Sequence, residues 1–118
     1  MGKTNNKTKQ NQQLQYLHMD VTDMRFDSNS FGVVIDKATF DAMYCSRGND
    51  SNRDENILKM SQEILRILKP GGSWVIISRG EVTAEKNALL MGEGNAFQFS
   101  VRMLQDETVI YLLQKKII

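Results

Sequence analysis

The sequence is poor in the residues that build disulfides and metal sites: its 118 residues include one cysteine and one histidine. Cys45 cannot form a disulfide within the chain, which agrees with a reducing compartment. One Cys and one His do not complete a zinc site or a Cys-His catalytic pair without carboxylates or another chain. We therefore assign no metal ligand and no catalytic residue.

Long hydrophobic runs are absent as well. A run such as Trp74 to Ile77 is far below the roughly 20 apolar residues that cross a bilayer, so we expect no membrane span. The first residues lack the apolar stretch of a secretory signal, and we predict a cytoplasmic protein. The formal net charge of +1 indicates no preference for nucleic acid, which we regard as a disfavoured partner.

The length of the chain fits one domain. Residues 1–13 are polar and almost free of apolar side chains, which predicts a disordered polar tail followed by one domain over residues 14–118. The tail carries Lys3, Lys7 and Lys9. An alternative interpretation is that these lysines bind nucleic acid or a membrane. The low charge and the lack of aromatic residues disfavour it.

Three apolar segments predict β-strands. Leu14 to Met19 is short and apolar-rich, and it ends at Asp20. Phe31 to Ile35 and Trp74 to Ser78 are nearly continuous apolar runs rich in β-branched residues, as in strands that are covered on both faces.

A helix is predicted between the second and third of these segments. Ser51 and Asp54 have the spacing of a capping box, and apolar residues then recur at helical spacing at Ile57, Met60, Ile64, Ile67 and Leu68. We expect the helix to end at Lys69, because Pro70 restricts the residue before it and Gly71-Gly72 favours a turn. Strand, helix and strand in this order predict a right-handed crossover and a parallel sheet.

Near the carboxyl end the hydrophobic period changes to two. Residues 97–103 alternate between apolar and polar side chains, and residues 108–113 follow after a polar turn, which predicts an antiparallel hairpin. Gly92-Glu93-Gly94 follows no strand and lacks a third glycine, so we interpret it as a connection and not as a nucleotide loop. The predicted fold class is α/β, with parallel strands and a terminal antiparallel hairpin.

Several segments taken together resemble a known family. Residues 19–24 (MDVTDM), 30–42 (SFGVVIDKATFDA) and 64–72 (ILRILKPGG) are similar to the third strand, the fourth strand and the turn before the fifth strand of class I, or seven-β-strand, S-adenosylmethionine-dependent methyltransferases. The DKATFDA segment is similar to the DKGTLDA motif of a subgroup that includes protein lysine methyltransferases, with Ala38 in place of Gly and Phe40 in place of Leu. The resemblance implies an incomplete Rossmann-like sheet that corresponds to the carboxyl-terminal part of the domain.

The resemblance also implies a site at the carboxyl ends of the strands, where ligands bind in open parallel sheets. It assigns Asp20, with Val21 beside it, to the adenine of S-adenosylmethionine, and Asp36 to the methionine end of the cofactor or to the substrate amine. Lys37, Thr39 and Asp41 would then line the mouth of the substrate site. The structural alternatives are that Asp20 caps a turn, that Asp36 ends a buried strand, and that the three later residues form a solvated loop.

The family's acidic-Gly-x-Gly loop has no counterpart here, because only about fifteen residues precede the Tyr16 strand and they hold no paired glycines. Methyl transfer depends on positioning, so we expect the isolated chain to be inactive. The Phe31 strand would expose an apolar edge, which proteins usually cover. We expect a homo- or hetero-oligomer through this edge, or a truncated sequence.

The first functional hypothesis is methyl transfer from S-adenosylmethionine to a protein lysine. The second is a non-catalytic subunit that binds a partner chain through the exposed sheet edge. The third is an unrelated small α/β domain.

Overall fold

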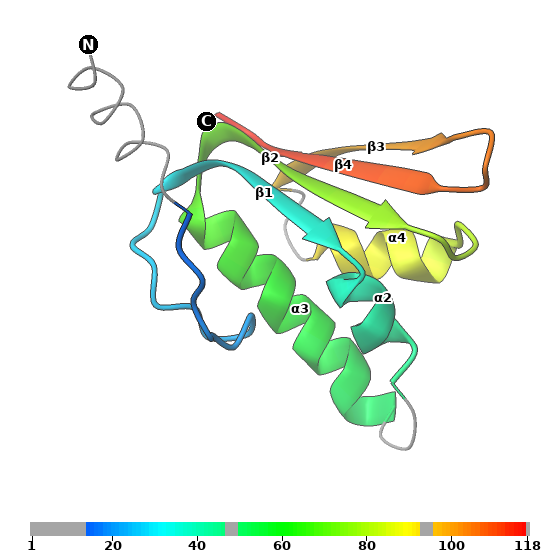
Figure 1. Cartoon of the computed structure of the whole chain (residues 1–118), viewed down its shortest axis with the longest axis horizontal. Helices are drawn as coiled ribbons and strands as arrows, with labels where there is room; N and C mark the ends of the chain where they lie inside the picture. The colour runs from blue at the N-terminus through cyan, green and yellow to red at the C-terminus, as the bar shows by residue number, and fades with distance from the viewer. Residues whose placement is uncertain (1–13, 47–49, 93–95, 118) are drawn as a thin grey trace, which may run out of the picture.

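The structure, a computed structural model, describes residues 14–46, 50–92 and 96–117, without the side chains of residues 50 and 51. Its elements, in chain order, are β1 (Phe31–Lys37), α2 (Thr39–Tyr44), α3 (Asp50–Ile67), β2 (Leu68–Ser78), α4 (Ala84–Met91), β3 (Phe97–Met103) and β4 (Val109–Lys115). The strands form one sheet in the order β1-β2-β4-β3, as Figure 1 shows.

The sheet confirms the predicted α/β fold class. Strands β1 and β2 are parallel, with Val34 opposite Trp74 and Asp36 opposite Ile76, and helix α3 makes the crossover between them. Strand β4 pairs antiparallel with both β2 and β3, so the predicted terminal hairpin is present as well.

The described helices lie on one side of the sheet (Figure 1). Helix α3 buries the side chains that its spacing predicted: Ile57, Met60, Ile64 and Ile67. They belong, with residues of the strands, to a core whose buried members are Phe40, Ile57, Met60, Ile64, Leu68, Trp74, Ile76, Leu90, Phe97, Val109, Tyr111 and Leu113. Burial of these side chains is the main force that closes the helices onto the sheet.

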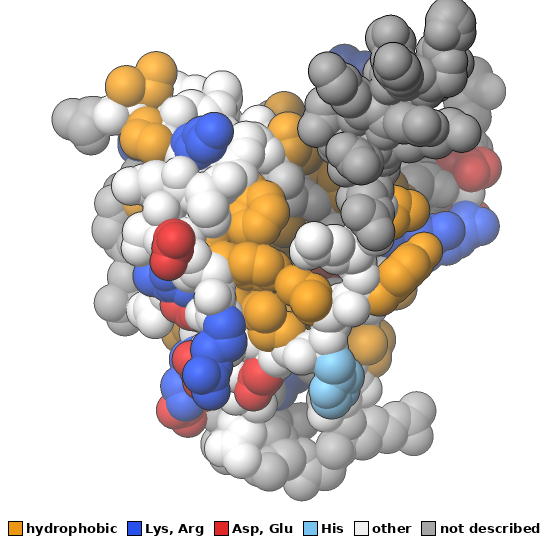
Figure 2. Space-filling model, turned by 60° about the vertical axis from the view of Figure 1, so that its left-hand side comes forward, with side chains coloured by type: hydrophobic (Ala, Val, Ile, Leu, Met, Phe, Trp, Pro, Cys, Tyr) orange, Lys and Arg blue, Asp and Glu red, His pale blue; other side chains and the backbone are white. Residues whose placement is uncertain are grey.

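Strand β1 is an edge strand of the described sheet, and the face that it turns away from the helices is apolar. Val33 is 56% exposed and Ile35 is 67% exposed. Figure 2 brings the left-hand side of Figure 1 forward and shows hydrophobic side chains gathered at that surface. The unpaired backbone groups along such an edge are a template for strand pairing. The prediction that this strand is covered on both faces is wrong, because Val33 and Ile35 are exposed on one of them.

The predicted strand at Leu14 to Met19 is wrong, because residues 14–20 form neither a strand nor a helix. A strand needs a neighbour for its backbone hydrogen bonds, and this segment pairs with none of the four strands. The apolar residues that suggested a strand are exposed here, with Leu14 at 76% and Tyr16 at 89%.

The predicted turn at Pro70-Gly71-Gly72 is also different in the structure. Helix α3 ends at Ile67 and β2 begins at once, so these residues lie within the strand. The pairing shifts from Phe31 opposite Leu68 to Val33 opposite Ser73, so the segment forms a bulge in β2. Gly71 has a φ of 82°, a left-handed conformation that glycine adopts without the clash of a Cβ.

Helices α2 and α4 had no counterpart in the predicted elements. Residues 1–13, the Ser51 side chain of the capping box, and Glu93 and Gly94 lie outside the described residues. None of the described helices is long and apolar enough to cross a membrane.

Candidate functional site at the carboxyl ends of strands β1 and β2

The two parallel strands end at one rim of the sheet, because Asp36 and Lys37 of β1 lie opposite Ile76 and Ile77 of β2. Helix α2 begins two residues after β1 and lies against this rim. Charged side chains of β1, of α2 and of the residue that follows β2 are therefore brought together there.

Asp36 is buried, with 6% of its surface exposed. Its carboxylate accepts hydrogen bonds from the backbone N–H groups of Thr39 at 2.8 Å and Phe40 at 3.2 Å, and so caps the first turn of α2. Desolvation raises the pKa of Asp36, the two backbone hydrogen bonds oppose this shift, and the negative charge of Asp41 adds to it. Oδ1 accepts from both N–H groups, so the acceptor capacity that remains for a ligand is mainly that of Oδ2.

Asp41 joins α2 to the end of β2. Its Oδ1 accepts a hydrogen bond from Ser78 Oγ at 2.6 Å, and its Oδ2 accepts one from the backbone N–H of Arg79 at 3.2 Å. Both oxygens are thus engaged by neutral donors, and the carboxylate is held in one orientation.

Ala38 connects β1 to α2 in a left-handed conformation, with a φ of 81°. A Cβ in such a conformation costs roughly 1–2 kcal/mol. This strained turn gives a physical reason for the glycine that the DKGTLDA motif has at this position.

A pocket of about 480 Å³ opens at the rim, lined by Lys37, Ala38, Asp41, Ile77, Arg79 and Thr108. Of the residues predicted for substrate, Lys37 and Asp41 line this pocket, whereas Thr39 is exposed and donates its backbone N–H to Asp36. Sequence reasoning missed Arg79 and Thr108. Arg79 follows directly after a predicted strand, and that position was the signal that could have found it.

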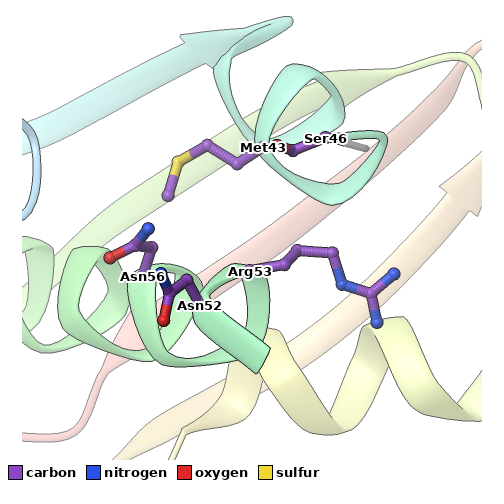
Figure 3. A pocket seen from close by; sticks show the side chains of 5 residues that line it. All are labelled: Met43, Ser46, Asn52, Arg53 and Asn56. Atoms are coloured by element: carbon purple, nitrogen blue, oxygen red, sulfur yellow. The ribbon is translucent and has the colours of Figure 1, made fainter. Parts of the chain in front are cut away.

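A second hollow lies between α2 and α3 and is shown in Figure 3. It measures about 180 Å³ and is lined by Met43, Ser46, Asn52, Arg53 and Asn56. The guanidinium of Arg53 extends away from the two asparagines, toward ion-pair partners at Asp54 (2.9 Å) and Glu85 (3.5 Å). The smaller volume and the paired charge make this hollow the weaker candidate.

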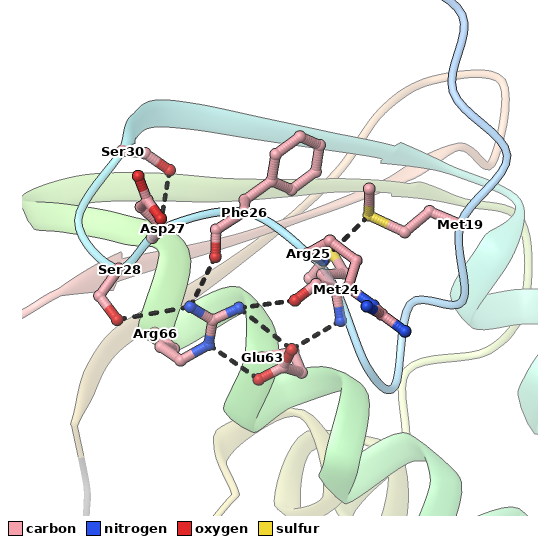
Figure 4. A network of polar contacts seen from close by, with 9 residues as sticks. All are labelled: Met19, Met24, Arg25, Phe26, Asp27, Ser28, Ser30, Glu63 and Arg66. Atoms are coloured by element: carbon pink, nitrogen blue, oxygen red, sulfur yellow. Dashed lines mark hydrogen bonds and ion pairs between the residues drawn. The ribbon is translucent and has the colours of Figure 1, made fainter.

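The segment that carries Asp20 is held against α3 by two side chains, as Figure 4 shows. Arg66 donates to the backbone oxygens of Phe26 at 2.7 Å and Met24 at 2.9 Å, and Glu63 accepts from the backbone N–H of Met24 at 2.7 Å. Arg66 and Glu63 also pair with each other at 3.0 Å. This network fixes a stretch of chain that has no regular secondary structure.

Asp20 itself lies in an exposed turn of this segment. Its carboxylate accepts hydrogen bonds from the backbone N–H of Thr22 at 2.9 Å and from the Thr22 hydroxyl at 2.7 Å. These hydrogen bonds lower the pKa of Asp20, the one from the backbone most strongly. In the part of the chain that the structure describes, no hydrogen bond joins Asp20 or Val21 to the rim at Asp36.

Parallel strands followed by an antiparallel hairpin are typical of a Rossmann-like fold, a class in which ligands bind at the carboxyl ends of the strands. The model of the family described as "Methyltransferase domain" matches residues 1–76. The chain belongs to this family, and the cofactor of the family is S-adenosylmethionine.

The human eEF1A lysine and N-terminal methyltransferase is 34% identical over 77 residues, which cover 65% of this chain and 11% of that protein. The chain thus spans about a tenth of the length of this curated relative.

Solved structures agree with the fold. A putative DNA modification methylase from Thermus thermophilus, complexed with S-adenosyl-L-methionine, has a TM-score of 0.53 at 16% identity, over 83% of this chain and 51% of that one. The [4+2]-cyclase SpnF has a TM-score of 0.64 at 13% identity, over 98% of this chain and 61% of that one. Since one neighbour is described as a methylase and the other as a cyclase, these likenesses establish the fold and not the reaction.

Proposed function

We propose that residues 14–118 form one part of a methyltransferase domain, and that this part takes part in methyl transfer from S-adenosylmethionine to a protein lysine. The observation that carries the proposal is the pocket that Lys37 and Asp41 line at the rim where β1 and β2 end, with the buried Asp36 carboxylate near enough to feel the charge of Asp41. The relative that acts on lysine, and the similarity of DKATFDA to the DKGTLDA motif, support the choice of acceptor.

The residues at the rim fit one part of the cofactor. Carboxylates are suitable acceptors for an amino group, and Asp36 retains lone pairs after it caps α2. Asp20 and Val21 would contact the adenine, and Asp36 the methionine end or the acceptor amine. The sequence has no glycine pair before Asp20 to approach the rest of the cofactor.

When bound, S-adenosylmethionine supplies an electrophilic methyl group that leaves the sulfonium sulfur for a neutral amine nitrogen. The task of the protein is to hold the acceptor in line and to keep its nitrogen unprotonated. Positive charges at Lys37 and Arg79 would favour the neutral form of an amine that comes near the rim. Asp41, which is held by Ser78 and Arg79, keeps this wall of the site rigid.

Isothermal titration of the chain with S-adenosylmethionine tests the proposal. Micromolar binding that Asp36→Asn weakens at least fivefold supports it. Binding that is unchanged in Asp36→Asn, or a chain that stays silent both alone and with added partners, contradicts it. A matched control is Glu55→Gln, which removes an exposed carboxylate on α3 that does not line the rim pocket.

A second candidate is a non-catalytic subunit that binds a partner chain through β1. The exposure of Val33 and Ile35 on an edge strand favours it. A subunit of this kind would not bind the cofactor by itself. Light scattering would show the mass of a complex with its partner chain. Ile35→Lys should abolish that association, because a charge would then lie in the strand-pairing surface.

A further inference from the structure

The rim pocket carries more positive than negative charge on its walls. Lys37 and Ile77 are partners in the β1–β2 register, so their side chains lie on the same face of the sheet, and Arg79 follows one residue beyond β2. Lys37 and Arg79 are both exposed. Ile77 supplies an apolar wall between these two cationic residues.

The one carboxylate among the residues that line this pocket is already engaged. Asp41 accepts hydrogen bonds from Ser78 and from the backbone of Arg79, so both of its oxygens already have a donor while its single negative charge faces the two cations of the pocket. A further acid lies close by, because Arg79 contributes to the lowered pKa of Asp106 after the larger effect of the Thr108 hydrogen bonds. That carboxylate is exposed, so its attraction for Arg79 is weak and screened by salt.

We propose that the rim pocket binds an acidic side chain of the protein substrate, one that flanks the methylated lysine, through Lys37 and Arg79. A glutamate fits these walls: its methylenes would contact Ile77 and the stems of the two basic residues, and its carboxylate would reach the guanidinium in a two-hydrogen-bond geometry. A lysine ammonium would instead meet two like charges. The acceptor amine therefore lies outside the pocket, and the pocket selects its neighbour in the sequence.

This inference rests on the proposed function for the identity of the substrate, but its test needs no cofactor. The probe is a fluorescein-labelled peptide with one lysine followed by three glutamates, and the reference is the same peptide with three glutamines. Fluorescence anisotropy with the full chain, in a buffer of about 50 mM salt, reports binding while surface charges are only partly screened.

The expected result is that the glutamate peptide binds at least tenfold more tightly than the glutamine peptide. Lys37→Gln and Arg79→Gln should each weaken the binding of the glutamate peptide about threefold to fivefold, which is the range expected for the loss of a partly exposed ion pair. The charge-matched control is Lys69→Gln, an exposed lysine in the bulge of β2 outside the pocket, which should change binding by less than a factor of about 1.5.

Equal binding of the two peptides would overturn the inference. So would a Lys69→Gln variant that weakens binding as much as the pocket variants, because the attraction would then be to net charge. If the glutamate preference persists in a chain that fails to bind S-adenosylmethionine, the pocket stands and the proposed function fails. If cofactor binding persists without the preference, only the pocket is refuted.

Discussion

Arg66 offers the sharpest test of how the segment before β1 is held. Its guanidinium donates to two backbone oxygens, those of Phe26 and Met24, and pairs with Glu63 on the same helix (Figure 4). The Arg66→Ala change removes these donors, and no other side chain of the network can replace a planar group with five N–H donors.

The magnitude follows from the geometry. A hydrogen bond from a charged group is worth about 1.5–3 kcal/mol when buried. The Arg66 side chain is 33% exposed, so part of this value is lost to water. For two carbonyl acceptors and a partly screened ion pair we expect Arg66→Ala to lower the free energy of unfolding by about 2–3 kcal/mol.

Urea denaturation measures this loss. Trp74, the single tryptophan, is fully buried, so its fluorescence reports global unfolding. The control on the same helix is Lys59→Ala. Lys59 pairs with Glu55 at 3.2 Å, and both side chains are more than half exposed, so the cost should stay below about 0.5 kcal/mol. An Arg66→Ala variant as stable as this control would refute the reasoning.

The pH dependence of the same network has a definite sign. The hydrogen bond from Arg66, more than the one from Met24, lowers the pKa of Glu63. A carboxyl group with a lowered pKa contributes stability that is complete above its unfolded value, about 4.3, and is lost as the pH falls through the folded value. The stability advantage of the natural chain over Glu63→Gln should therefore shrink between about pH 5 and pH 3. An advantage that is constant over this range would contradict the assignment.

Three further changes test the rim and the helix cap. Ala38→Gly should raise the free energy of unfolding by about 0.5–1 kcal/mol in urea denaturation. The reason is that the strain of Ala38 in the left-handed turn costs more free energy than the entropy that glycine adds to the unfolded state. A loss of stability would show that the turn is unstrained. Burial raises the pKa of Asp36, so the contribution of Asp36 to the free energy of unfolding should be largest at low pH and should fall as the pH rises above about 4. Urea denaturation of Asp36→Asn and of the natural chain across about pH 3–7 measures this trend. A contribution that grows with pH would contradict it. Thr83→Ala should cost about 1 kcal/mol, since Thr83 Oγ1 accepts a hydrogen bond from the backbone N–H of Lys86 at 3.1 Å at the start of α4; an unchanged melting curve would exclude a role for this cap.

Local pattern was enough for the elements whose burial follows a simple period. The helical spacing of Ile57, Met60 and Ile64 predicted α3, and the apolar run at Phe31 predicted β1. The same reasoning failed at Leu14 to Met19, because a short apolar run becomes a strand only where a neighbouring strand accepts its hydrogen bonds. Whether that neighbour exists is a property of the assembled sheet and not of the run.

The candidate site divides in the same way. Asp36, Lys37 and Asp41 could be predicted from the sequence, because charged residues that come directly after an apolar run lie at the carboxyl end of the strand. Thr108 joins them only because β4 pairs with β2, which sets Val109 opposite Ser78. Arg79 joins them through the pairing of β1 with β2.

The sequence by itself determined the α/β class, the parallel crossover, the hairpin and the family resemblance, since each depends on periodicity or on a short motif. Only the tertiary structure decided that the Asp36 carboxylate caps α2, that Pro70-Gly71-Gly72 bulges within β2, and that two cations share a pocket. These features depend on contacts between residues far apart in the chain or on the exact path of the backbone, and neither leaves a periodic trace in the sequence.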